Sequence, residues 1–546
     1  MAGLVTAFGS GAMTNSINEI SDSKMMFVIG ANPSEAHPVI AAKMRQARRK
    51  GAGLIVADPR KTELAAMADV WLQLKPGSDV ALLNGLMHVI LRDNLQDSDF
   101  IAHCTSGFAS VASTVANYPP DVVEQITGVN AVLLEQAARL YAKAEQAQIF
   151  YTLGITEHCW GTDNVLSIAN LAMLTGNVGK PCSGVNPLRG QNNVQGACDM
   201  GALPDVLPGY RKVTEEDERR RFEQAWQVNL PSLRGFTIPE MFTAAASGEV
   251  KAMYIVGENP VLSDANANHV VQALQSLEFL VVQEIFLTET AMLADVVLPA
   301  ASFAEKNGTF TNTERRIQLV RKAVEPPGQS RTDLEIITDL SGRLGYPMHY
   351  AGPEAVMQEI SALTRIYHGV TYDRLEKTGL QWPVPDITHP GTPYLHENGQ
   401  FTCGLGWFTP VEYHPPAEGP DAEYPLVLTT GRQLYHYNVS TFGKSAALSE
   451  HLPEELLWIH PTDAQRNLLA EGQWVNVESR RGSIPVRIRL TDAVPPGLVW
   501  LSFHFPAAPT NRITNDAGDQ ITRTYEYKVC AVKISVLPDR FKEYTS

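Results

Sequence analysis

Two ten-residue stretches of this 546-residue sequence echo each other. Residues 24–33, KMMFVIGANP, and residues 251–260, KAMYIVGENP, share Lys, Met, Gly, Asn and Pro at equivalent positions. Because Val and Ile dominate buried parallel strands, a chance match between two strands accounts for the apolar half of this similarity. It does not account for the Gly-x-Asn-Pro turn that follows both strands. The echo therefore predicts two copies of one structural unit.

Each copy leads through a helical stretch to a second apolar strand that ends near an acidic residue. The second strand is 54–57 (LIVA), followed by Asp58, in the first copy, and 279–282 (FLVV), followed by Gln283 and Glu284, in the second. A strand, a helix and a strand over this length form a βαβ unit, and an acidic residue at this position is where such units hold a ribose. We predict an α/β fold with two Rossmann-like, doubly wound lobes related by pseudo-symmetry. Two ligands, or one elongated ligand, would bind between them.

A polar segment, Lys75-Pro76-Gly77-Ser78-Asp79, precedes the helix predicted over 80–92. Ser78 or Asp79 is placed to cap this helix. The exposed amide groups at a helix start can also bind a phosphate. Both interpretations, a plain cap and a phosphate site, are open from these residues.

The stretch 181–201, PCSGVNPLRGQNNVQGACDMG, holds four glycines, three asparagines, two glutamines and a single arginine. This composition predicts a loop, because it carries neither helical nor strand periodicity. Glycines allow close backbone approach, and amide side chains suit a neutral heterocycle with several polar edges. Arg189 offers a planar fork that matches a carboxylate or a phosphate. An ordinary surface loop is the alternative.

The chain beyond residue 423 changes character. Short strands with turn residues between them are predicted at 426–430, 474–479, 483–490, 498–502 and 527–534, which favours a small β-barrel. Polar residues such as Arg432 and His436 follow the first of these strands and belong either to a site or to the surface. Residues 381–421 are rich in proline and glycine, which predicts a linker or a segment that wraps around the domains. The predicted domains are a first lobe over 1–190, a second lobe over 191–350, a helical and Pro/Gly-rich connection over 351–422, and the barrel over 423–546.

Composition excludes several classes of function. Lys and Arg number 44 against 59 Asp and Glu, giving a net charge of −15, and no long basic run is present, which argues against nucleic-acid or anionic-membrane binding. No apolar run approaches the roughly 18 residues of a membrane span, so we expect no direct membrane insertion. The six cysteines are widely spaced without a CxxC pair, which predicts reduced thiols in a cytoplasmic protein.

The residues 189–205, RGQNNVQGACDMGALPD, resemble the signature of the formate dehydrogenase catalytic (alpha) subunits, within the molybdopterin oxidoreductases of the dimethyl sulfoxide reductase type. The Gly-x-Asn-Pro turns, Asp58-Pro59-Arg60, Gly77-Ser78-Asp79, the 294–312 stretch, and the Thr-Gly-Arg and Glu-Tyr-Lys elements near the end also occur in the family's order. The resemblance runs over nearly the whole chain.

The resemblance implies two molybdopterin guanine dinucleotides holding one molybdenum or tungsten ion, and oxidation of formate to carbon dioxide with two electrons passed to partners. Arg189 would hold the formate carboxylate, with Gln191 beside it as the second catalytic residue. The implied partners are formate or carbon dioxide, and iron–sulfur or flavin electron-transfer subunits or a hydrogenase. The implied cofactor-binding residues are Gly30, Asn32, Asp58, Arg60, Gly77, Asp79, Gly154, Glu157 and Gly190, then Gly257, Glu258, Asn259, Gln283 and Asn312, and in the barrel Gly431, Arg432, His436, Asn511 and Lys528.

The sequence departs from the family where it begins. The family's amino-terminal [4Fe–4S] domain, and the cysteine or selenocysteine followed by histidine that ligates the metal, have no counterpart here. No residue of this sequence is therefore predicted as a metal ligand. We expect Met1 to be an artificial start downstream of a selenocysteine codon, and the chain alone to be inactive. A non-catalytic scaffold subunit of a respiratory complex, or a split enzyme completed by a separate iron–sulfur chain, are the alternatives.

Overall fold

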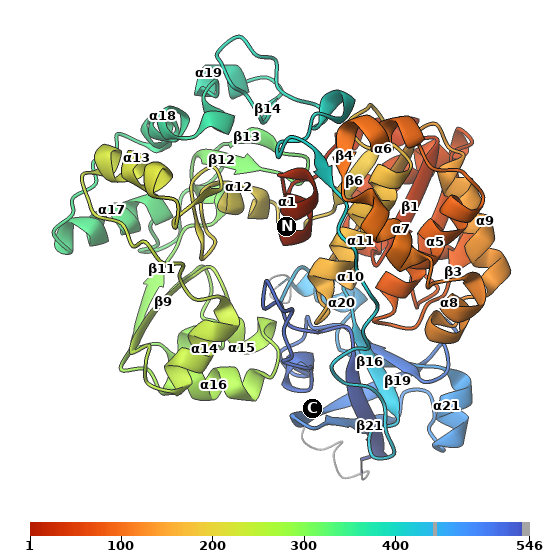
Figure 1. Ribbon diagram of the computed structural model, residues 1–546. Coiled ribbons are helices and arrows are strands. Elements are labelled where there is room, and N and C mark those ends of the chain that lie inside the picture. The colour runs from red at the N-terminus through yellow and green to blue at the C-terminus, as the bar shows by residue number, and fades with distance from the viewer. Residues whose placement is uncertain (440–444, 538–546) are drawn as a thin grey trace. The chain divides into compact units, whose positions relative to one another are not determined.

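A computed structural model describes residues 1–439 and 445–537 of the chain (Figure 1). The chain divides into two compact units. The first unit comprises Met1–Leu188, Pro260–Val270 and Tyr394–Ser546, and the second comprises Arg189–Asn259 and Val271–Pro393. The chain therefore leaves the first unit and returns to it twice.

A five-stranded parallel sheet forms the centre of the first unit. Its strand order is β3-β2-β1-β5-β6. All five residues of β1 and of β5 are buried, as expected for strands covered on both faces. The strands are β1 (Met25–Ile29), β2 (Gly53–Ala57), β3 (Val70–Leu72), β5 (Ala147–Tyr151) and β6 (Gly184–Pro187).

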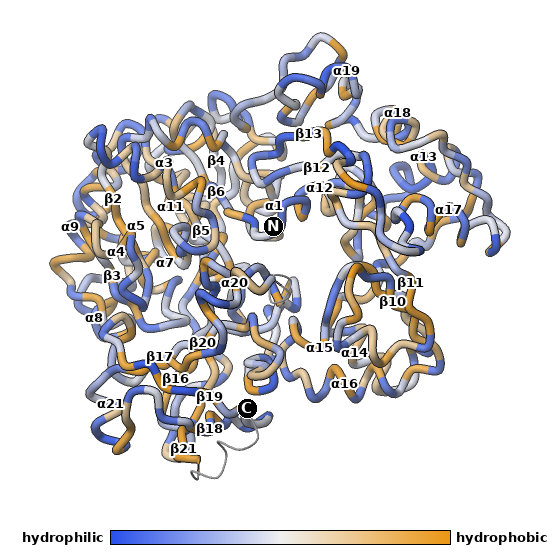
Figure 2. The backbone as a smooth tube through the Cα atoms, turned by 180° about the vertical axis from the view of Figure 1, so that it is seen from behind, coloured by the Kyte–Doolittle hydropathy of each residue, from blue (hydrophilic) through white to orange (hydrophobic). Residues whose placement is uncertain are grey.

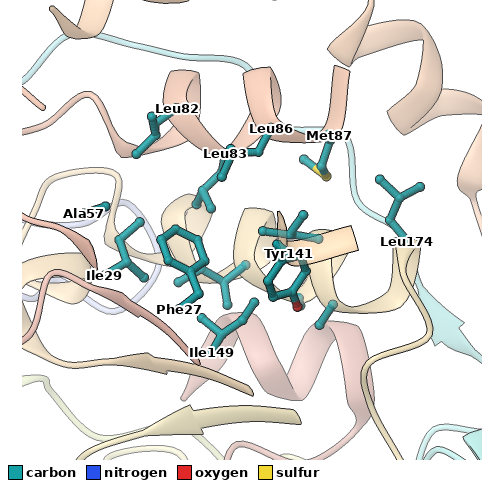
Figure 3. Close-up of a cluster of buried hydrophobic side chains, with 14 of the residues drawn as sticks. Phe27, Ile29, Ala57, Leu82, Leu83, Leu86, Met87, Tyr141, Ile149 and Leu174 are labelled. Carbon is teal, nitrogen blue, oxygen red and sulfur yellow. The ribbon is translucent and has the colours of Figure 1, made fainter. Parts of the chain in front are cut away.

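Helices cover both faces of this sheet, so the lobe is doubly wound. Alternate residues of β1 enter two different hydrophobic clusters: Phe27 and Ile29 pack with Leu83 and Tyr141 in one (Figure 3), whereas Met26 and Val28 pack with residues of α3 in the other. The helices are α1 (Ala2–Phe8), η1 (Ile17–Asp22), α2 (Pro33–Ala36), α3 (Pro38–Arg49), α4 (Glu63–Ala66), α5 (Asp79–Arg92), α6 (Ser98–Cys104), α7 (Phe108–Val115), α8 (Pro120–Thr127), α9 (Ala131–Ala142), α10 (Leu153–Thr156) and α11 (Gly161–Leu174).

The first unit also contains the carboxyl-terminal barrel. Six strands close in the order β16-β20-β17-β19-β18-β21. Alternate residues of β18 are buried, which is the pattern of a strand with one face on a core. The strands are β16 (Leu426–Thr430), β17 (Leu456–Ile459), β18 (Trp474–Ser479), β19 (Gly482–Leu490), β20 (Leu498–Leu501) and β21 (Cys530–Val536); the remaining elements are η5 (Glu397–Gly399), α20 (Ala446–His451), α21 (Pro461–Arg466), η6 (Thr510–Arg512) and the small sheet of β4 (Thr105–Ser106) with β15 (Gly406–Trp407).

The second unit contains a three-stranded parallel sheet in the order β11-β10-β9. Its strands are β9 (Ala252–Val256), β10 (Phe279–Glu284) and β11 (Val296–Pro299). This order is the same as that of the first three strands of the first sheet. The turn after the first strand is also the same: the Gly30 N–H donates to Ala57 O at 3.0 Å, and the Gly257 N–H donates to Gln283 O at 2.9 Å.

A second hydrogen bond repeats in both sheets. The Leu54 N–H donates to Asp69 Oδ2 at 2.8 Å, and the Leu280 N–H donates to Asp295 Oδ2 at 2.7 Å. Each aspartate N–H in turn donates to the same leucine's carbonyl oxygen, at 2.8 Å and 2.9 Å. The internal repeat predicted from two ten-residue stretches thus extends to the third strand, and the α/β fold with two such lobes and a terminal barrel is confirmed.

The remainder of the second unit is an antiparallel sheet with helices. Strands β12 (Gly308–Thr311) and β13 (Arg316–Val320) form a hairpin, which β14 (Leu380–Gln381) extends. Helix α13 is hydrophilic and appears blue in Figure 2. The other elements are α12 (Val194–Asp199), β7 (Val206–Leu207), β8 (Arg211–Lys212), α13 (Glu216–Trp226), α14 (Ile238–Ala246), η2 (Ala291–Leu293), η3 (Phe303–Glu305), α17 (Asp333–Arg343), α18 (Pro353–Leu363), η4 (Arg365–Tyr367) and α19 (Tyr372–Leu375), while α15 (Pro260–Ser263) lies in the first unit and α16 (Ala267–Gln275) crosses the boundary.

Two local predictions were wrong. The stretch 181–201 is not a continuous loop, because β6 pairs with β5 and Val194–Asp199 forms α12; backbone pairing to a neighbouring strand overrides weak local propensity. Strand β17 was missed, since its four residues, LLWI, lie between a helix and a proline-led helix without a turn signal.

Among residues 1–439 and 445–537, no helix has the length and apolar character needed to cross a membrane.

Candidate functional site

A pocket lies at the carboxyl ends of the strands of the first sheet. Strands β1, β2 and β5 end at Ile29, Ala57 and Tyr151, and the residues that follow each of them line the pocket. This is the edge at which open α/β sheets bind ligands. The residues predicted from the sequence that the structure brings together here are Gly30, Asn32, Asp58, Arg60, Asp79, Gly154, Gly431, Arg432 and Lys528.

Two of these glycines allow the loops after β1 and β5 to cross. The Gly154 N–H donates to Gly30 O at 3.0 Å, and Gly30 has a φ of +55°. A Cβ atom on Gly154 would lie 2.5 Å from Gly30 O, closer than any side chain tolerates. The two loops therefore contact each other through backbone atoms at the bottom of the pocket. Because neither glycine has a side chain, the space next to this contact stays open.

The loop after β2 places a carboxyl group, from Asp58, and a guanidinium, from Arg60, in the pocket. Asp58 and Arg60 are both buried, and Asp58 Oδ1 accepts a hydrogen bond from the Arg60 N–H at 2.8 Å. Burial raises the pKa of Asp58, and the nearby Arg60 guanidinium partly offsets that rise. The Arg60 guanidinium lies over the ring of Trp500, 4.7 Å from its centroid, so its charge is held in place by a barrel residue.

The barrel supplies two further cations. Lys528 Nζ lies 2.7 Å from Glu157 Oε2 and donates to Thr430 O and Thr430 Oγ1 at 3.2 Å each. Glu157, predicted as a site residue, does not line the pocket itself. It forms an ion pair with Lys528, which does. Burial lowers the pKa of Arg432, and Glu157 opposes that effect. The strand β16 ends at Thr430, which is why Gly431 and Arg432 reach the pocket.

Two carboxyl groups, Glu35 and Asp79, and the imidazole of His158 also line the pocket. Burial raises the pKa of Glu35 and raises that of Asp79 to about 6. Burial lowers the pKa of His158, but the Glu526 carboxylate, 3.7 Å from its Nδ1, and the charge of Asp79 outweigh this, and the net shift is upward. Glu35 and His158 were not predicted as site residues from the sequence. Each follows a glycine-containing turn at the end of a strand, and this position is the sequence feature that could have identified them.

This set of donors and acceptors fits a dinucleotide with a pterin or purine ring. Three cations, Arg60, Arg432 and Lys528, suit a pyrophosphate, while carboxylates accept hydrogen bonds from ring N–H groups and ribose hydroxyls. Within the described residues, Asn32 Oδ1 and Glu35 Oε2 are buried and have no hydrogen-bond partner. Because buried polar atoms are rarely left unpaired, these two indicate where a ligand's donors belong.

Besides Glu157, three predicted residues of the first unit do not line this pocket. Gly77 has a φ of +81°, and a Cβ there would lie 2.5 Å from Pro416 Cγ. His436 is buried, with Nε2 2.9 Å from Leu452 O. Asn511 donates to Leu262 O at 2.7 Å and to Ser263 O at 3.0 Å. The structure gives each of them a packing role, and their cofactor contacts stay predictions.

Four predicted residues of the second lobe, Gly257, Glu258, Asn259 and Gln283, lie at the equivalent edge of its sheet, and Asn312 lies in the turn between β12 and β13. Asn259 Oδ1 accepts from Thr290 Oγ1 at 2.7 Å, and Gln283 Nε2 donates to Asp333 Oδ1 at 2.6 Å. Gly257 has a φ of +65°, Glu258 is exposed, and Asn312 Oδ1 accepts from the Arg316 N–H at 3.0 Å. Their amides hold turns, and their cofactor roles also stay predictions.

The loop that carries Arg189, Gly190 and Gln191 opens the second unit. The Arg189 N–H donates to Thr313 Oγ1 at 3.1 Å, and its guanidinium donates from Nη1 to Cys198 Sγ at 3.8 Å. Gln191 is exposed. The loop therefore presents a partly buried arginine with a defined contact and an amide beside it.

A further group missed from the sequence joins the first lobe to the barrel. Glu526 is fully buried, and its Oε1 accepts from the N–H and the thiol of Cys159, at 3.2 Å each. Its Oε2 accepts from the Ala417 N–H at 3.1 Å and from Asn515 Nδ2 at 3.2 Å. These residues are up to 367 positions apart, and no local pattern links them.

Comparison with known proteins assigns the class. Residues 4–343 match the molybdopterin oxidoreductase family, and residues 426–531 match the molybdopterin dinucleotide binding domain. The fold and the pocket of mixed charge agree with these matches, and the chain belongs to the molybdopterin oxidoreductase family. It thus binds a molybdopterin dinucleotide.

The chain is similar along its length to formate dehydrogenase subunits. It is 48% identical over 538 residues to the F420-dependent formate dehydrogenase subunit alpha of Methanocaldococcus jannaschii, covering 98% of this chain and 80% of that protein. It is 42% identical over 547 residues to formate dehydrogenase H of Escherichia coli, covering 99% and 76%. Among solved structures, acetylene hydratase from Pelobacter acetylenicus has the same fold, with a TM-score of 0.75 at 21% identity over 98% of this chain and 80% of that one.

Within the described residues, no group of three or more His, Cys, Asp or Glu side chains is placed to hold a metal ion. All six cysteines are free thiols.

Proposed function

We propose that this protein is the catalytic subunit of a formate dehydrogenase, converting formate to carbon dioxide, a proton and two electrons. The observation that carries the proposal is the 48% identity to a formate dehydrogenase subunit alpha over 98% of the chain. Formate offers only a carboxylate and one C–H bond for recognition. A fixed arginine fork is therefore nearly the whole of a formate site, and Arg189 is the cation that we assign to it.

The pocket of the first unit is our site for one molybdopterin guanine dinucleotide. Arg60, Arg432 and Lys528 would hold its pyrophosphate, and Asp58 with Glu35 would accept hydrogen bonds from its sugar and base. We assign Gly257, Asn259 and Gln283 of the second lobe to a second dinucleotide, supported by the repeated turn after β9. With molybdenum or tungsten bound, the cofactor supplies the two-electron acceptor, and the protein supplies orientation and charge.

The electrons leave through partners that we propose to be iron–sulfur or flavin subunits or a hydrogenase. Support for such partners comes from the relatives, whose names describe subunits of larger enzymes. The cytoplasm is the compartment we propose, because all six thiols are free.

The proposal is tested on the holoenzyme isolated with its partner subunits. We expect formate-dependent reduction of a viologen dye and about one molybdenum or tungsten ion per chain, since one metal serves both dinucleotides. Arg189→Lys keeps the charge but loses the fork, and we expect the KM for formate to rise about tenfold or more. Arg343→Lys, on the exposed face of α17, is the matched control. Metal-free protein without formate oxidation would reject the proposal in favour of a scaffold.

A further inference from the structure

A buried carboxylate lies at the carboxyl-terminal end of α12, the helix that follows the loop carrying Arg189 and Gln191. Asp199 is the last residue of α12 and is fully buried. Its Oδ1 accepts from Tyr210 OH at 2.7 Å and from Gln195 Nε2 at 2.8 Å. Its Oδ2 accepts from Tyr367 OH and from Trp382 Nε1, at 2.7 Å each.

None of the four donors carries a formal charge. Gln195 lies within α12 itself, whereas Tyr210, Tyr367 and Trp382 come from three other segments of the second unit. Burial raises the pKa of Asp199, and the bonds from Tyr367, Tyr210, Gln195 and Trp382 oppose that rise. Hydrogen bonds to an ionised carboxylate are shorter and about twice as strong as bonds between neutral groups. The Asp199 carboxylate therefore fixes the carboxyl-terminal end of α12 to the segments that carry Tyr210, Tyr367 and Trp382.

The same network holds the other end of α12. Tyr367 OH lies 2.8 Å from Thr311 Oγ1, and the Thr311 N–H donates to Oδ1 of Asn193 at 2.8 Å. Asn193 precedes the first residue of the helix. The helix is therefore fixed at both ends by side chains that meet at Tyr367.

The helix carries Cys198, and Cys198 touches the proposed substrate arginine. Arg189 Nη1 donates to Cys198 Sγ at 3.8 Å. Burial raises the pKa of the Cys198 thiol, the Arg189 guanidinium lowers it, and Asp199 raises it. The thiol thus lies within the electrostatic reach of both the arginine and the carboxylate.

We propose that Asp199 is a positioning residue for Arg189: its carboxylate ties α12 to three donors outside the helix, and α12 presents the Cys198 thiol that the guanidinium lies against. The inference rests on the proposed function, because it takes Arg189 as the residue that receives formate. Asp199 does not touch the substrate. Its effect is on how well Arg189 is pre-oriented, and it is therefore an effect on anion affinity.

The test is Asp199→Asn in the holoenzyme. Turning the Gln195 amide presents its Oε1 to the new Nδ2 and to the Tyr210 hydroxyl, so the variant loses the charge while Tyr367 and Trp382 keep an acceptor on the other oxygen. We expect the KM for formate to rise about tenfold while kcat changes less than about twofold, because weaker bonds loosen the arginine without touching the redox step. Nitrite, a bent anion of the same charge, gives a readout without turnover. Its calorimetric dissociation constant for the oxidised holoenzyme should rise by the same factor.

Two controls separate positioning from folding. Asp463→Asn changes another buried carboxylate, which accepts from the Gly497 N–H at 2.6 Å in the barrel, and should leave both affinities unchanged. Cys198→Ala removes the link without touching the carboxylate and should raise both constants in the same direction. Cys530→Ala, a buried thiol in the barrel, is its matched control. If Asp199→Asn does not fold, Cys198→Ala carries the test.

The outcomes are distinguishable. Unaltered holoenzyme that fails to oxidise formate rejects the proposed function, and the substrate assignment of Arg189 with it. In a holoenzyme that does oxidise formate, unchanged formate KM and nitrite affinity in Asp199→Asn, or in Cys198→Ala, overturn the inference alone.

Discussion

The Glu526 carboxylate of the barrel accepts two hydrogen bonds from Cys159 of the first lobe, one from the backbone N–H and one from the thiol. The same carboxylate accepts the Ala417 N–H on its other oxygen. A backbone N–H cannot accept a hydrogen bond, so both oxygens must be acceptors. The first lobe and the barrel are therefore joined by a group for which glutamine is no substitute.

Glu526→Gln should lower the free energy of unfolding. In either orientation the new amide places an NH₂ group against a backbone N–H, and leaving such a donor buried and unpaired costs about 1–3 kcal/mol. Urea denaturation followed by circular dichroism measures the change. Glu412→Gln, at an exposed position, is the control and should be neutral. Equal stability of the two variants would show that the hydrogen bonds of Glu526 to Cys159 and Ala417 contribute nothing to stability.

Lys528→Gln should weaken cofactor binding. The substitution removes a pocket cation and leaves Glu157 without the ammonium that lies 2.7 Å from it. Truncating one partner of a buried, hydrogen-bonded charge pair costs 2 kcal/mol or more, so we expect affinity to fall about tenfold or more. Fluorescence of the released, oxidised pterin reports the cofactor content of the purified protein. Lys533→Gln, on β21 with exposed acidic partners, should retain a full complement.

Glu455 makes the stability of the barrel depend on pH. Burial raises its pKa from an ordinary 4.5 to about 7, so the folded chain holds this proton more tightly than the unfolded chain does. The folded state binds more protons between these two values, and the free energy of unfolding therefore falls as pH rises from about 4.5 to about 7.

Glu455→Gln should remove that dependence. The glutamine oxygen can still accept the Ser502 N–H, which now lies 3.0 Å from the carboxylate, and its NH₂ can donate to Ser502 Oγ. We expect the variant to equal or exceed the unaltered protein in stability at pH 8. Denaturant unfolding at pH 5 and pH 8 checks the expectation. Glu454→Gln, at the half-buried neighbouring position, should keep the slope of the unaltered protein, and an unchanged slope in Glu455→Gln would falsify the assignment.

Gly154→Ala should destabilise the floor of the pocket. Its Cβ would lie 2.5 Å from Gly30 O and 2.7 Å from Gly30 C, and backbone on both sides cannot yield without a shift. We expect a loss of about 1–3 kcal/mol in the free energy of unfolding, the range for overpacked sites, and a lower cofactor content. Gly342→Ala lies in α17, with nothing within 4 Å of the added atom, and should instead stabilise the chain by up to about 1 kcal/mol.

The parts of the fold that the sequence predicted are those with strong local signals. Continuous apolar runs such as MMFVI located β1, and its echo located β9, because buried parallel strands need both faces apolar. The four-residue strand β17 lacks flanking turn residues and was missed. Nine predicted site residues line one pocket because most occupy turns after strands, and such turns converge in this fold. Asp79, at the start of α5, and Lys528, just before β21, are the exceptions.

The remaining site residues could not be predicted because their partners are distant in the chain. Glu526 meets Cys159 across 367 positions, and Asp199 meets Trp382 across 183. Neither contact has a periodicity or a spacing that marks it in one sequence. Glu35 and His158 lay beside predicted residues, but only the pocket distinguishes them from ordinary turn residues.

The twofold return of the chain to its first unit has a consequence for biosynthesis. The pocket needs His158 and Lys528, whose codons are 370 apart, since 528 − 158 = 370. At about 5–20 residues per second, the ribosome takes roughly 20 to 75 seconds to travel from one to the other. During that interval the carboxyl ends of the first sheet's strands are not yet covered by the barrel. The pocket is therefore incomplete, and it cannot enclose the cofactor, until most of the barrel has been translated. Cofactor loading therefore follows translation of the barrel and comes later than the folding of the lobe that receives the cofactor.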